Sequence, residues 1–418
     1  MFPIRSLGVA TLLLLTTGPL AAQPLTNPAA QKALAARFDA IATEPGCAGV
    51  ALRIATLNAS GRAQVIFERY SKRGEGPLTR YPTASAIKWI SAATVLAARD
   101  RSKTERWARP IDLDAPLRGV LRVFTDAYVD QKRKGAITLR HLFSHTSNLP
   151  GEDQEDMRAE SLQDWVIRVA TGRSGLANPP KDPAIRLLTY ADFPNHKAPR
   201  GKANTTPPPG TIFDYGSASM QTGAGVVETL YQINTGTNDD WHAIFDRHLA
   251  RPLKLENPSN APIYPRRGPN DTPQVAGGGS MGLRDYNRLQ LMLANDGVYG
   301  RTRVLSKDAV AELTRPTTEG VTVLGRGSSN LQPDPAKSTQ RVAEYGLGMW
   351  LQDRNRRGKP RILFHHGASG FRNVIWVPER VALAGKLDLT RKATPLQERR
   401  IEQLMSELIA DVERQVRD

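Results

Sequence analysis

The chain has 418 residues, 40% of them apolar, and a formal net charge of +16, which fits one large domain or two lobes with a packed interior. Cys47 is the only cysteine, and this excludes an internal disulfide and cysteine-based zinc or iron–sulfur sites. The basic runs QKRK (131–134) and RNRRGKPR (354–361) are short and stand among turn formers, so we expect no nucleic-acid partner.

Residues 1–22 have the order of a secretory signal peptide. Arg5 precedes an apolar run from Leu7 to Leu15, and small residues follow near Ala22. The run is about half of the roughly 20 apolar residues that a spanning helix needs. We expect cleavage near residues 22–23, with an uncleaved anchor as the alternative, and a periplasmic or secreted protein without a transmembrane segment after signal removal. Its positive charge would favour loose attraction to anionic envelope surfaces.

The next segment predicts a helix, a hairpin and a second helix. Residues 29–43 favour a helix that EPGC ends. The segments 48–57 and 63–70 predict two strands joined by NASGR. The second helix is expected from Ser85 to about Arg101.

Between about 106 and 340, helical segments alternate with loops rich in proline and glycine. The helical segments are LRHLFSHT, SLQDWVIRVATG, SASMQTGAGVVETLYQI and LRDYNRLQLMLAND. The stretch 177–211 carries PP and TTPPPG and is dominated by loop formers. A connection of this length is typical of a functional segment, such as the wall of a site, or of a segment ordered in short pieces.

Strand signals return after residue 340, in GLGMWLQ, RILFHHG, RNVIWV and VALAGKLDL. Residues 395–415 then predict a closing helix. Strands at both ends of the chain, with helices between them, predict one sheet built from both termini and a helical lobe inserted in the middle.

Two serines compete for the role of a nucleophile, and the first of them is Ser280. Residues 278–282, GGSMG, match the G-x-S-x-G elbow, which needs a buried strand before the serine and a helix after it. The helix is expected, but the preceding YPRRGPNDTPQVAG is full of strand breakers. A glycine-rich turn with Ser280 capping a helix start is the better interpretation.

Ser85 stands three residues before Lys88 at the expected start of a helix. Positions i and i+3 share one helix face, so the lysine amine can reach the serine hydroxyl. A lysine desolvated there would lose proton affinity and could act as a base. The N–H groups at the helix start could stabilise an oxyanion. Taken alone, this spacing is weak, because a solvated helix face would also carry it.

Context supports Ser85, because the chain resembles the class C β-lactamase and penicillin-recognising serine hydrolases, a family that includes D,D-carboxypeptidases, D-aminopeptidases and esterases. That family uses Ser-x-x-Lys at a helix start, a Tyr-x-Asn-like element and a Lys/His-x-Gly element on a strand. The chain has, in this order, Ser85-Ala86-Ile87-Lys88, Tyr215-Gly216-Ser217 and His365-His366-Gly367. The stretches ITLRHLFSHTSNLPG, GGGSMGLRDYNRL and YGLGMW also fit, and the resemblance covers about residues 30–390.

The resemblance implies a role for each matched residue. Ser85 would attack a carbonyl to form an acyl-enzyme, and Lys88 and Tyr215 would take and return its proton. The backbone N–H groups of Ser85 and Ala368 would form the oxyanion hole. His365, on the strand with Gly367, would face a carboxylate or polar end of the substrate. No cofactor is implied.

Three departures from the family pattern bear on the substrate and on a turn. Ser217 replaces the common asparagine and removes a carboxamide that would contact the substrate. His365 stands where β-lactamases carry lysine, and histidine is not fixed positive near neutral pH. Both changes favour an esterase or amidase over a true β-lactamase. Asn148 stands where glycine is common, and asparagine tolerates positive φ.

The resemblance also implies an α/β architecture of the α+β type, with the β-lactamase/transpeptidase-like fold. An antiparallel sheet flanked by helices, from residues 23–105 and 341–418, would face a mostly helical lobe at 106–340. The site would lie in the crevice between them. Ser85 would be at its floor, Tyr215 on the helical wall and His365 along the sheet edge.

Other interpretations stay open. His141 and His145 have a spacing that could hold zinc, but no third ligand stands nearby in sequence, so we expect no metal. Trp350 and Trp376 are expected in the core. The main hypothesis is a serine hydrolase acting on a small ester or amide; the alternatives are a class C-type β-lactamase or D,D-carboxypeptidase, and a non-catalytic peptidoglycan- or penicillin-binding relative.

Overall fold

The computed structural model describes residues 23–124, 133–149, 161–171, 206–256, 263–264, 273–324 and 344–417. The segment expected to be a signal peptide and most of the loop expected at 177–211 lie outside these residues. Within the described ranges, no helix combines the length and the apolar character needed to cross a membrane.

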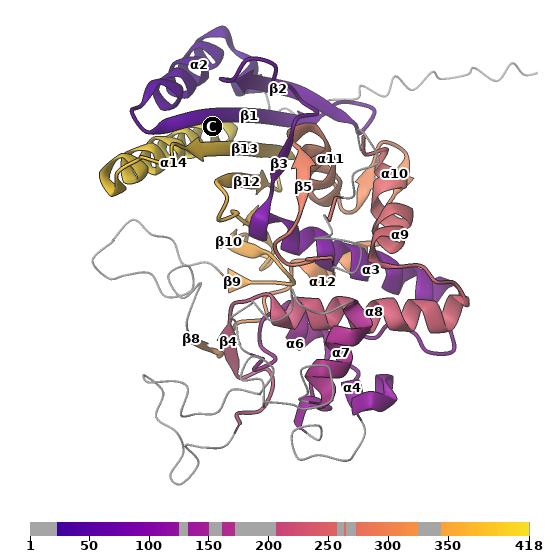
Figure 1. The fold of residues 1–418 in the computed structure, drawn as a ribbon. Helices are drawn as coiled ribbons and strands as arrows, with labels where there is room; N and C mark the ends of the chain where they lie inside the picture. Colours follow the sequence, from indigo (N-terminus) through magenta and orange to yellow (C-terminus); the bar gives the residue numbers. More distant parts are fainter. Residues whose placement is uncertain are drawn as a thin grey trace, which may run out of the picture.

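The described residues contain a seven-stranded sheet drawn from both ends of the chain, in the order β2-β1-β13-β12-β11-β10-β9. Every neighbouring pair is antiparallel. Its strands are Cys47–Leu57 (β1), Ala63–Tyr70 (β2), Glu344–Tyr345 (β9), Trp350–Arg354 (β10), Pro360–Phe364 (β11), Phe371–Trp376 (β12) and Val381–Leu389 (β13). Figure 1 shows β1 beside β13, and Val50 pairs with Leu387. The expected single sheet from both termini is confirmed.

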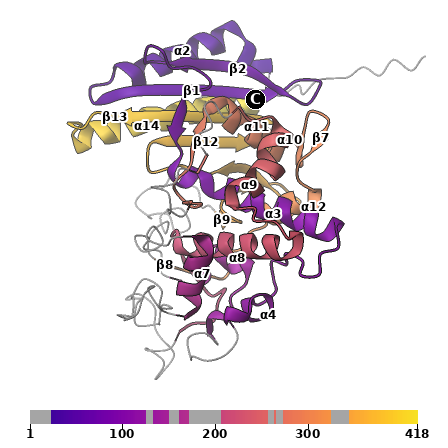
Figure 2. The same cartoon turned by 45° about the vertical axis from the view of Figure 1, so that its right-hand side comes forward.

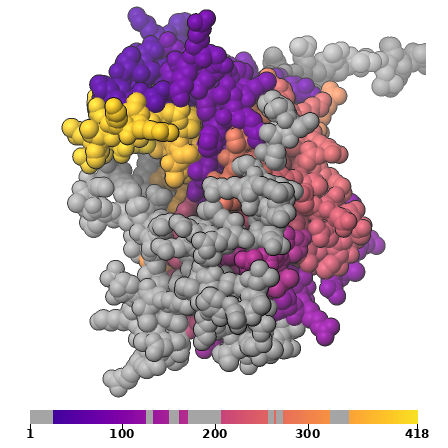
Figure 3. All heavy atoms as spheres, in the orientation of Figure 1, coloured from indigo at the N-terminus to yellow at the C-terminus, as the bar shows by residue number. Residues whose placement is uncertain are grey.

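One face of the sheet is covered by the first long helix, α2 (Pro28–Thr43), and the last, α14 (Pro395–Arg417). Along β1, Val50, Leu52 and Ile54 share this face, because strand side chains alternate. They pack in one buried cluster with Phe38 of α2 and Leu408 of α14. In the space-filling view, residues from the two ends of the chain lie against each other at one end of the molecule (Figure 3).

The other face carries small residues and a different helix. Ala55 of β1 and Ala382 of β13 are fully buried against Leu291 of α11 (Leu283–Ala294). Small side chains let the helix axis approach the strands, and Gln290 uses this proximity to donate to the backbone carbonyls of Val374 and Leu383. Figure 2 shows α11 beside the sheet. Thus α11 packs on the sheet although its sequence position lies within the range expected for the helical lobe.

The helices α3 (Lys88–Thr104) and α8 (Ala218–Thr235) lie at the centre of the remaining structure. Both are buried along most of their length. Shorter elements surround them: α4 (Leu117–Val120), η3 (Arg122–Phe124), α6 (Leu139–Phe143), α7 (Leu162–Thr171), α9 (Trp241–Phe245), η7 (Asp246–Ala250), α10 (Arg251–Leu253) and α12 (Lys307–Leu313). The short α1 (Gln23–Thr26) packs instead against α2 and α14. Three two-stranded pairs complete the described fold: β3 (Arg80–Pro82) with β5 (Ser280–Gly282), β4 (Ile212–Asp214) with β8 (Thr322–Leu324), and β6 (Val298–Tyr299) with β7 (Thr302–Arg303).

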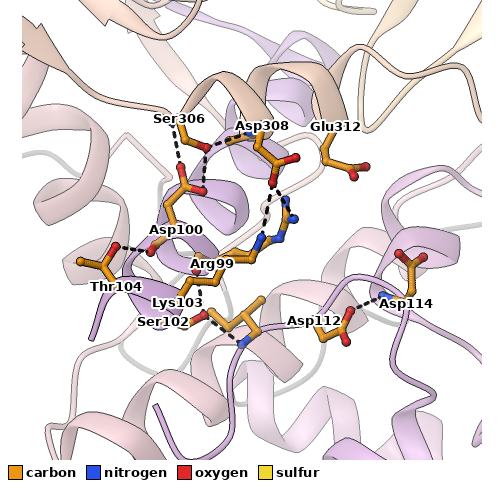
Figure 4. Close-up of polar contacts among 12 residues, drawn as sticks. Arg99, Asp100, Ser102, Lys103, Thr104, Asp112, Asp114, Ser306, Asp308 and Glu312 are labelled. Carbon is orange, nitrogen blue, oxygen red and sulfur yellow. Dashed lines mark hydrogen bonds and ion pairs between the residues drawn. The ribbon is translucent and has the colours of Figure 1, made fainter. Parts of the chain in front are cut away.

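Polar contacts fix α12 to the C-terminal half of α3 (Figure 4). The Asp100 carboxylate accepts from the backbone N–H of Ser306 (2.8 Å) and from its hydroxyl (2.9 Å), and Ser306 in turn caps α12. Arg99 and Lys103 both donate to Asp308 in the first turn of α12. These contacts hold α12 in place, and Leu313 at its end accepts a hydrogen bond from Leu347, which lies next to the candidate site.

Candidate active site

A short η2 turn (Ala84–Ile87) carries Ser85 between strand β3 and helix α3. Thr83, at its entry, donates its backbone N–H to the Gly279 carbonyl at 2.7 Å. Ala84 adopts φ 44°, a conformation that L residues other than glycine rarely take. The backbone is therefore strained directly before Ser85, and such strain clusters at functional sites.

Lys88 is the first residue of α3, and its side chain is buried, with 2% exposure. Its Nζ lies 3.2 Å from Ser85 Oγ and 2.6 Å from the Ala276 carbonyl oxygen. It also lies 4.8 Å from the centre of the Tyr215 ring. The three contacts hold the amine against the serine hydroxyl, as the i, i+3 spacing predicts.

The glycine-rich loop at 277–282 packs against the turn that carries Ser85. A Cβ on Gly279 would lie 2.5 Å from Thr83 Oγ1 and 2.7 Å from Ile87 Cδ1, so a side chain there would force Thr83 or Ile87 to move. Ser280 opens β5 and pairs with Pro82 of β3. Ser280 thus lies in a strand rather than at the strand-to-helix turn that a nucleophile elbow requires.

Tyr215 follows β4 and lies in a group of aromatic rings. Its ring stacks on Trp350 at 6.1 Å and 23°, and meets His145 at 4.8 Å. Tyr345 approaches it edge-on at 6.3 Å. Trp350 is 4% exposed, which confirms its expected core position, and Trp376 is fully buried on the other side of the sheet. The phenol is thereby held rigidly beside Lys88.

Tyr215 and His365 are joined by a hydrogen bond of 2.7 Å between the phenol oxygen and Nε2. The other ring nitrogen, Nδ1, lies 2.6 Å from the Gly348 carbonyl oxygen. A carbonyl only accepts, so Nδ1 carries the proton. In neutral His365, Nε2 is then an acceptor and the Tyr215 hydroxyl donates to it.

His365 is 1% exposed. Burial, and next the positive charge of Lys88, hold the pKa of His365 well below the usual 6.5, so the ring is neutral at neutral pH. Both nitrogens are engaged within the protein. This geometry does not suit the expected contact between His365 and a substrate carboxylate, since the ring offers neither a positive charge nor an open donor.

The two histidines considered as zinc ligands have other partners. His141 Nδ1 accepts from the Thr138 backbone N–H in a capping box. His145 Nδ1 accepts from the Gly216 N–H, and its Nε2 lies 3.2 Å from the Tyr345 hydroxyl. Burial lowers the pKa of His145 well below its usual value. In the described part of the chain, no group of three or more histidine, cysteine or carboxylate side chains could hold a metal.

Gly367 brings the end of β11 against the Ser85 turn. A Cβ at this position would lie 2.0 Å from the Thr83 carbonyl oxygen. The Gly367 N–H is bonded to Phe371, whereas the N–H groups of Ser85 and Ala368 have no hydrogen-bond partner among the described residues. Two unpaired donors on adjoining segments suit an oxyanion hole. Ser217, the remaining expected contact, is half-buried directly before α8.

Some functional contacts could not be found in the sequence. The partners of Lys88 and His365 include the backbone carbonyls of Ala276 and Gly348, and a carbonyl leaves no side-chain signal. Tyr345 belongs to YGLGMW, a stretch that fits the family pattern but for whose residues the resemblance implies no role. Asn148 takes φ 63°, as expected for a residue in place of glycine, and its amide donates to the Pro207 carbonyl.

Several solved structures share the fold of this chain. A candidate β-lactamase from Bacteroides dorei DSM 17855 has a TM-score of 0.61 at 18% identity, with 91% of this chain and 98% of that chain covered. EstCE1, a hydrolase with promiscuous acyltransferase activity, has a TM-score of 0.53 at 16% identity, covering 90% and 99%. A family VIII carboxylesterase has a TM-score of 0.55 at 16% identity, covering 90% and 97%.

These likenesses, all below 25% identity, establish the fold. No curated protein sequence matches the chain. The sequence profile of the Beta-lactamase family matches residues 34–399, and the chain belongs to this family. The predicted β-lactamase/transpeptidase-like fold is confirmed.

Proposed function

We propose that the protein is a serine hydrolase that cleaves a small ester or amide through an acyl-enzyme on Ser85. One observation carries the proposal: a buried lysine amine lies 3.2 Å from the hydroxyl of a serine on a strained turn. A serine hydroxyl is a weak nucleophile unless a base takes its proton. Lys88 is in reach to do so in its neutral amine form, and it becomes a cation once it has taken the proton.

In the first half of the reaction, Ser85 Oγ attacks the substrate carbonyl carbon and its proton passes to Lys88. The carbonyl oxygen becomes an oxyanion, which the N–H groups of Ser85 and Ala368 would stabilise. The tetrahedral intermediate collapses when the alcohol or amine leaves with that proton. Water then attacks the acyl-enzyme in the reverse sense, returning a proton to Ser85 and releasing the acid.

Tyr215 and His365 support this proton transfer. The Tyr215 hydroxyl donates to His365, so toward Lys88, whose amine lies over its ring, the phenol oxygen can only accept a hydrogen bond. Full transfer of a proton to His365 is disfavoured, because the resulting cation would be buried near Lys88. We therefore assign His365 as a residue that positions Tyr215.

We infer the substrate class from the groups that the described residues of the site do not supply. A β-lactam carries a carboxylate, and neutral His365 offers it no charge, while Ser217 offers no carboxamide. Esters and uncharged amides need neither. Structural neighbours named as a carboxylesterase and a hydrolase with acyltransferase activity support this choice. Another structural neighbour, SurE, has a TM-score of 0.57 and was solved with D-Leu. D-amino-acid amides are therefore a second substrate class to test.

A true β-lactamase is the second candidate, favoured by the family that the chain belongs to. Hydrolysis of p-nitrophenyl butyrate and nitrocefin by the wild type and by Ser85→Ala separates the candidates. Ester turnover that is lost in the variant, with nitrocefin slow or untouched, supports the proposal. Comparable nitrocefin turnover selects the β-lactamase. A non-catalytic binding relative would turn over neither substrate.

A further inference from the structure

A cavity of about 510 Å³ lies apart from Ser85, between α10 and the tips of two hairpins. One tip is the turn between β1 and β2, which contributes Ser60 and Arg62, and the other is the β6–β7 turn, which contributes Arg301 and Thr302. Lys254, at the end of α10, closes the third side. None of the residues that line this cavity belongs to the candidate active site.

The walls of this cavity are fixed by hydrogen bonds. Gly300 donates its N–H to the Gly61 carbonyl at 2.7 Å, which joins the two hairpin tips. The Asn58 side chain accepts from the backbone N–H groups of Ser60 and Arg62, at 2.9 and 3.0 Å, and so shapes the first tip. Arg62 and Arg301 therefore project from a frame that is already ordered before any ligand binds, which lowers the entropy cost of binding.

The charge of the cavity is positive and largely uncompensated. Among the described residues, none of those that line it carries a carboxylate. Arg288, which also lines the cavity, is already paired with Asp285 and Glu256. Arg62, Lys254 and Arg301, by contrast, have no carboxylate within ion-pair distance in the ranges that the structure describes. Three cations that converge on one hollow raise the local concentration of anions.

We propose that this cavity binds a phosphate-bearing anion. Arginine guanidinium groups match phosphate oxygens with two parallel hydrogen bonds, and lysine adds a point charge. The hydroxyl of Thr302 adds a further donor at the same opening, whereas that of Ser60 already donates to the Asn58 side chain at 2.7 Å. The volume lies in the range of small-ligand sites, about 300–1,000 Å³. The phosphate can belong to a free small molecule or to a lipid headgroup. The proposal is independent of the hydrolase reaction.

Calorimetric titration with sodium tripolyphosphate tests the site on the full chain. The wild type should bind one equivalent, with an affinity that falls as salt rises. The double variant Arg62→Glu/Arg301→Glu should bind at least tenfold more weakly. The matched control is Arg399→Glu/Arg400→Glu, two exposed arginines on α14 that change the net charge equally. The control should bind as the wild type does, and unchanged thermal unfolding shows that each variant is folded.

Co-sedimentation with vesicles of phosphatidylglycerol, and with phosphatidylcholine as the neutral reference, identifies the source of the phosphate. Vesicle binding lost only in Arg62→Glu/Arg301→Glu assigns the site to lipid headgroups. Tripolyphosphate binding lost in that variant, with no vesicle binding that depends on it, assigns the site to a soluble phosphate. Absence of tripolyphosphate binding, or equal weakening in the α14 control, would overturn the proposal.

Discussion

The Gly348 carbonyl accepts a hydrogen bond from Nδ1 of His365, and this leaves Nε2 as an acceptor. The Tyr215 hydroxyl therefore donates a hydrogen bond of 2.7 Å to His365. This direction separates the site from one in which a cationic lysine occupies the same strand position. Neutral His365 accepts the hydrogen bond of the Tyr215 hydroxyl and so orients the phenol. A cationic lysine at this position would instead donate to the phenol oxygen and would attract a substrate carboxylate.

The first prediction concerns this contact. Replacement His365→Phe removes the acceptor and should lower kcat by about tenfold, the effect of one hydrogen bond worth about 1.4 kcal/mol, with little change in KM. Steady-state kinetics with p-nitrophenyl butyrate measure both constants. His366→Gln, at the exposed neighbouring position, is the control and should leave kcat unchanged. A rise in KM at constant kcat would instead indicate that His365 contacts the substrate.

The same contact makes a prediction about pH. The pKa of His365 lies well below 6.5, because burial and Lys88 disfavour its charged form. The ring is therefore neutral at pH 6.5 and above, and no ionisation of His365 should contribute to the pH dependence of kcat near neutral pH. A limb near pH 6.5 that disappears in His365→Phe would contradict this account.

Lys88 should be required for chemistry rather than for folding. Lys88→Met keeps most of the length of the side chain and removes the base, so kcat/KM should fall by about a hundredfold to ten-thousandfold. Lys134 is a matched control, since it is also fully buried and donates to a backbone carbonyl, that of Val169 at 2.7 Å. Lys134→Met should lower the thermal stability and retain the activity. Equal losses of activity in both variants would show that burial of a lysine, not its role as a base, is what matters.

Gly367→Ala should disrupt the junction between β11 and the Ser85 turn. The new Cβ would lie 2.0 Å from the Thr83 carbonyl oxygen, so one of the two segments must move. We expect a large loss of kcat and a lower unfolding temperature. Gly76→Ala is the control, because its Cβ would meet no atom within 4 Å. An active Gly367→Ala variant with wild-type stability would refute the close packing of these two segments.

Stability should depend on pH through Glu228 on α8. Burial raises its pKa from 4.5 to about 7, although the carboxylate accepts from the Trp241 backbone N–H at 2.6 Å and from Gln163. The folded state therefore binds this proton more tightly than the unfolded chain does. The resulting stabilisation is fully present below about pH 4.5 and is lost as the pH rises through about 7; the shift corresponds to about 3 kcal/mol.

The measurement for Glu228 is the free energy of unfolding in urea across this pH range, for the wild type and for Glu228→Gln. The uncharged variant should lose less stability between pH 5 and 7.5 than the wild type does. The difference between the two curves isolates Glu228 from Asp285, whose pKa burial raises to about 6 and which acts in the same direction. Parallel curves would contradict the raised pKa of Glu228.

The long elements of this fold could be predicted from the sequence, because each carries its own periodic pattern. The expected strand at 381–389 matches β13, and the expected helix at 29–43 matches α2 to within one residue. The pairing of Arg80–Pro82 with Ser280–Gly282 could not be predicted, since three-residue strands have no pattern and lie about 200 positions apart. The placement of α11 on the sheet depends on where Gln290 finds carbonyl partners, which is a tertiary property.

One part of the candidate site could likewise be predicted from the sequence, and another part could not. The proximity of Ser85 and Lys88 follows from local helix geometry, so the spacing alone predicts it. The surroundings of His365 do not follow from its motif, because its charge state depends on burial and on the Gly348 carbonyl. The aromatic group around Tyr215 brings together residues from three distant segments, including His145, for which the sequence analysis predicted no contact with Tyr215.

The central claim, that Ser85 is the nucleophile, is tested most directly by labelling with a serine-directed fluorophosphonate, followed by mass spectrometry of the peptides. The account predicts one adduct per chain on Ser85, its loss in Ser85→Ala, and its persistence in Ser280→Ala. An adduct on Ser280, or labelling that survives in Ser85→Ala, would contradict the assignment of the nucleophile.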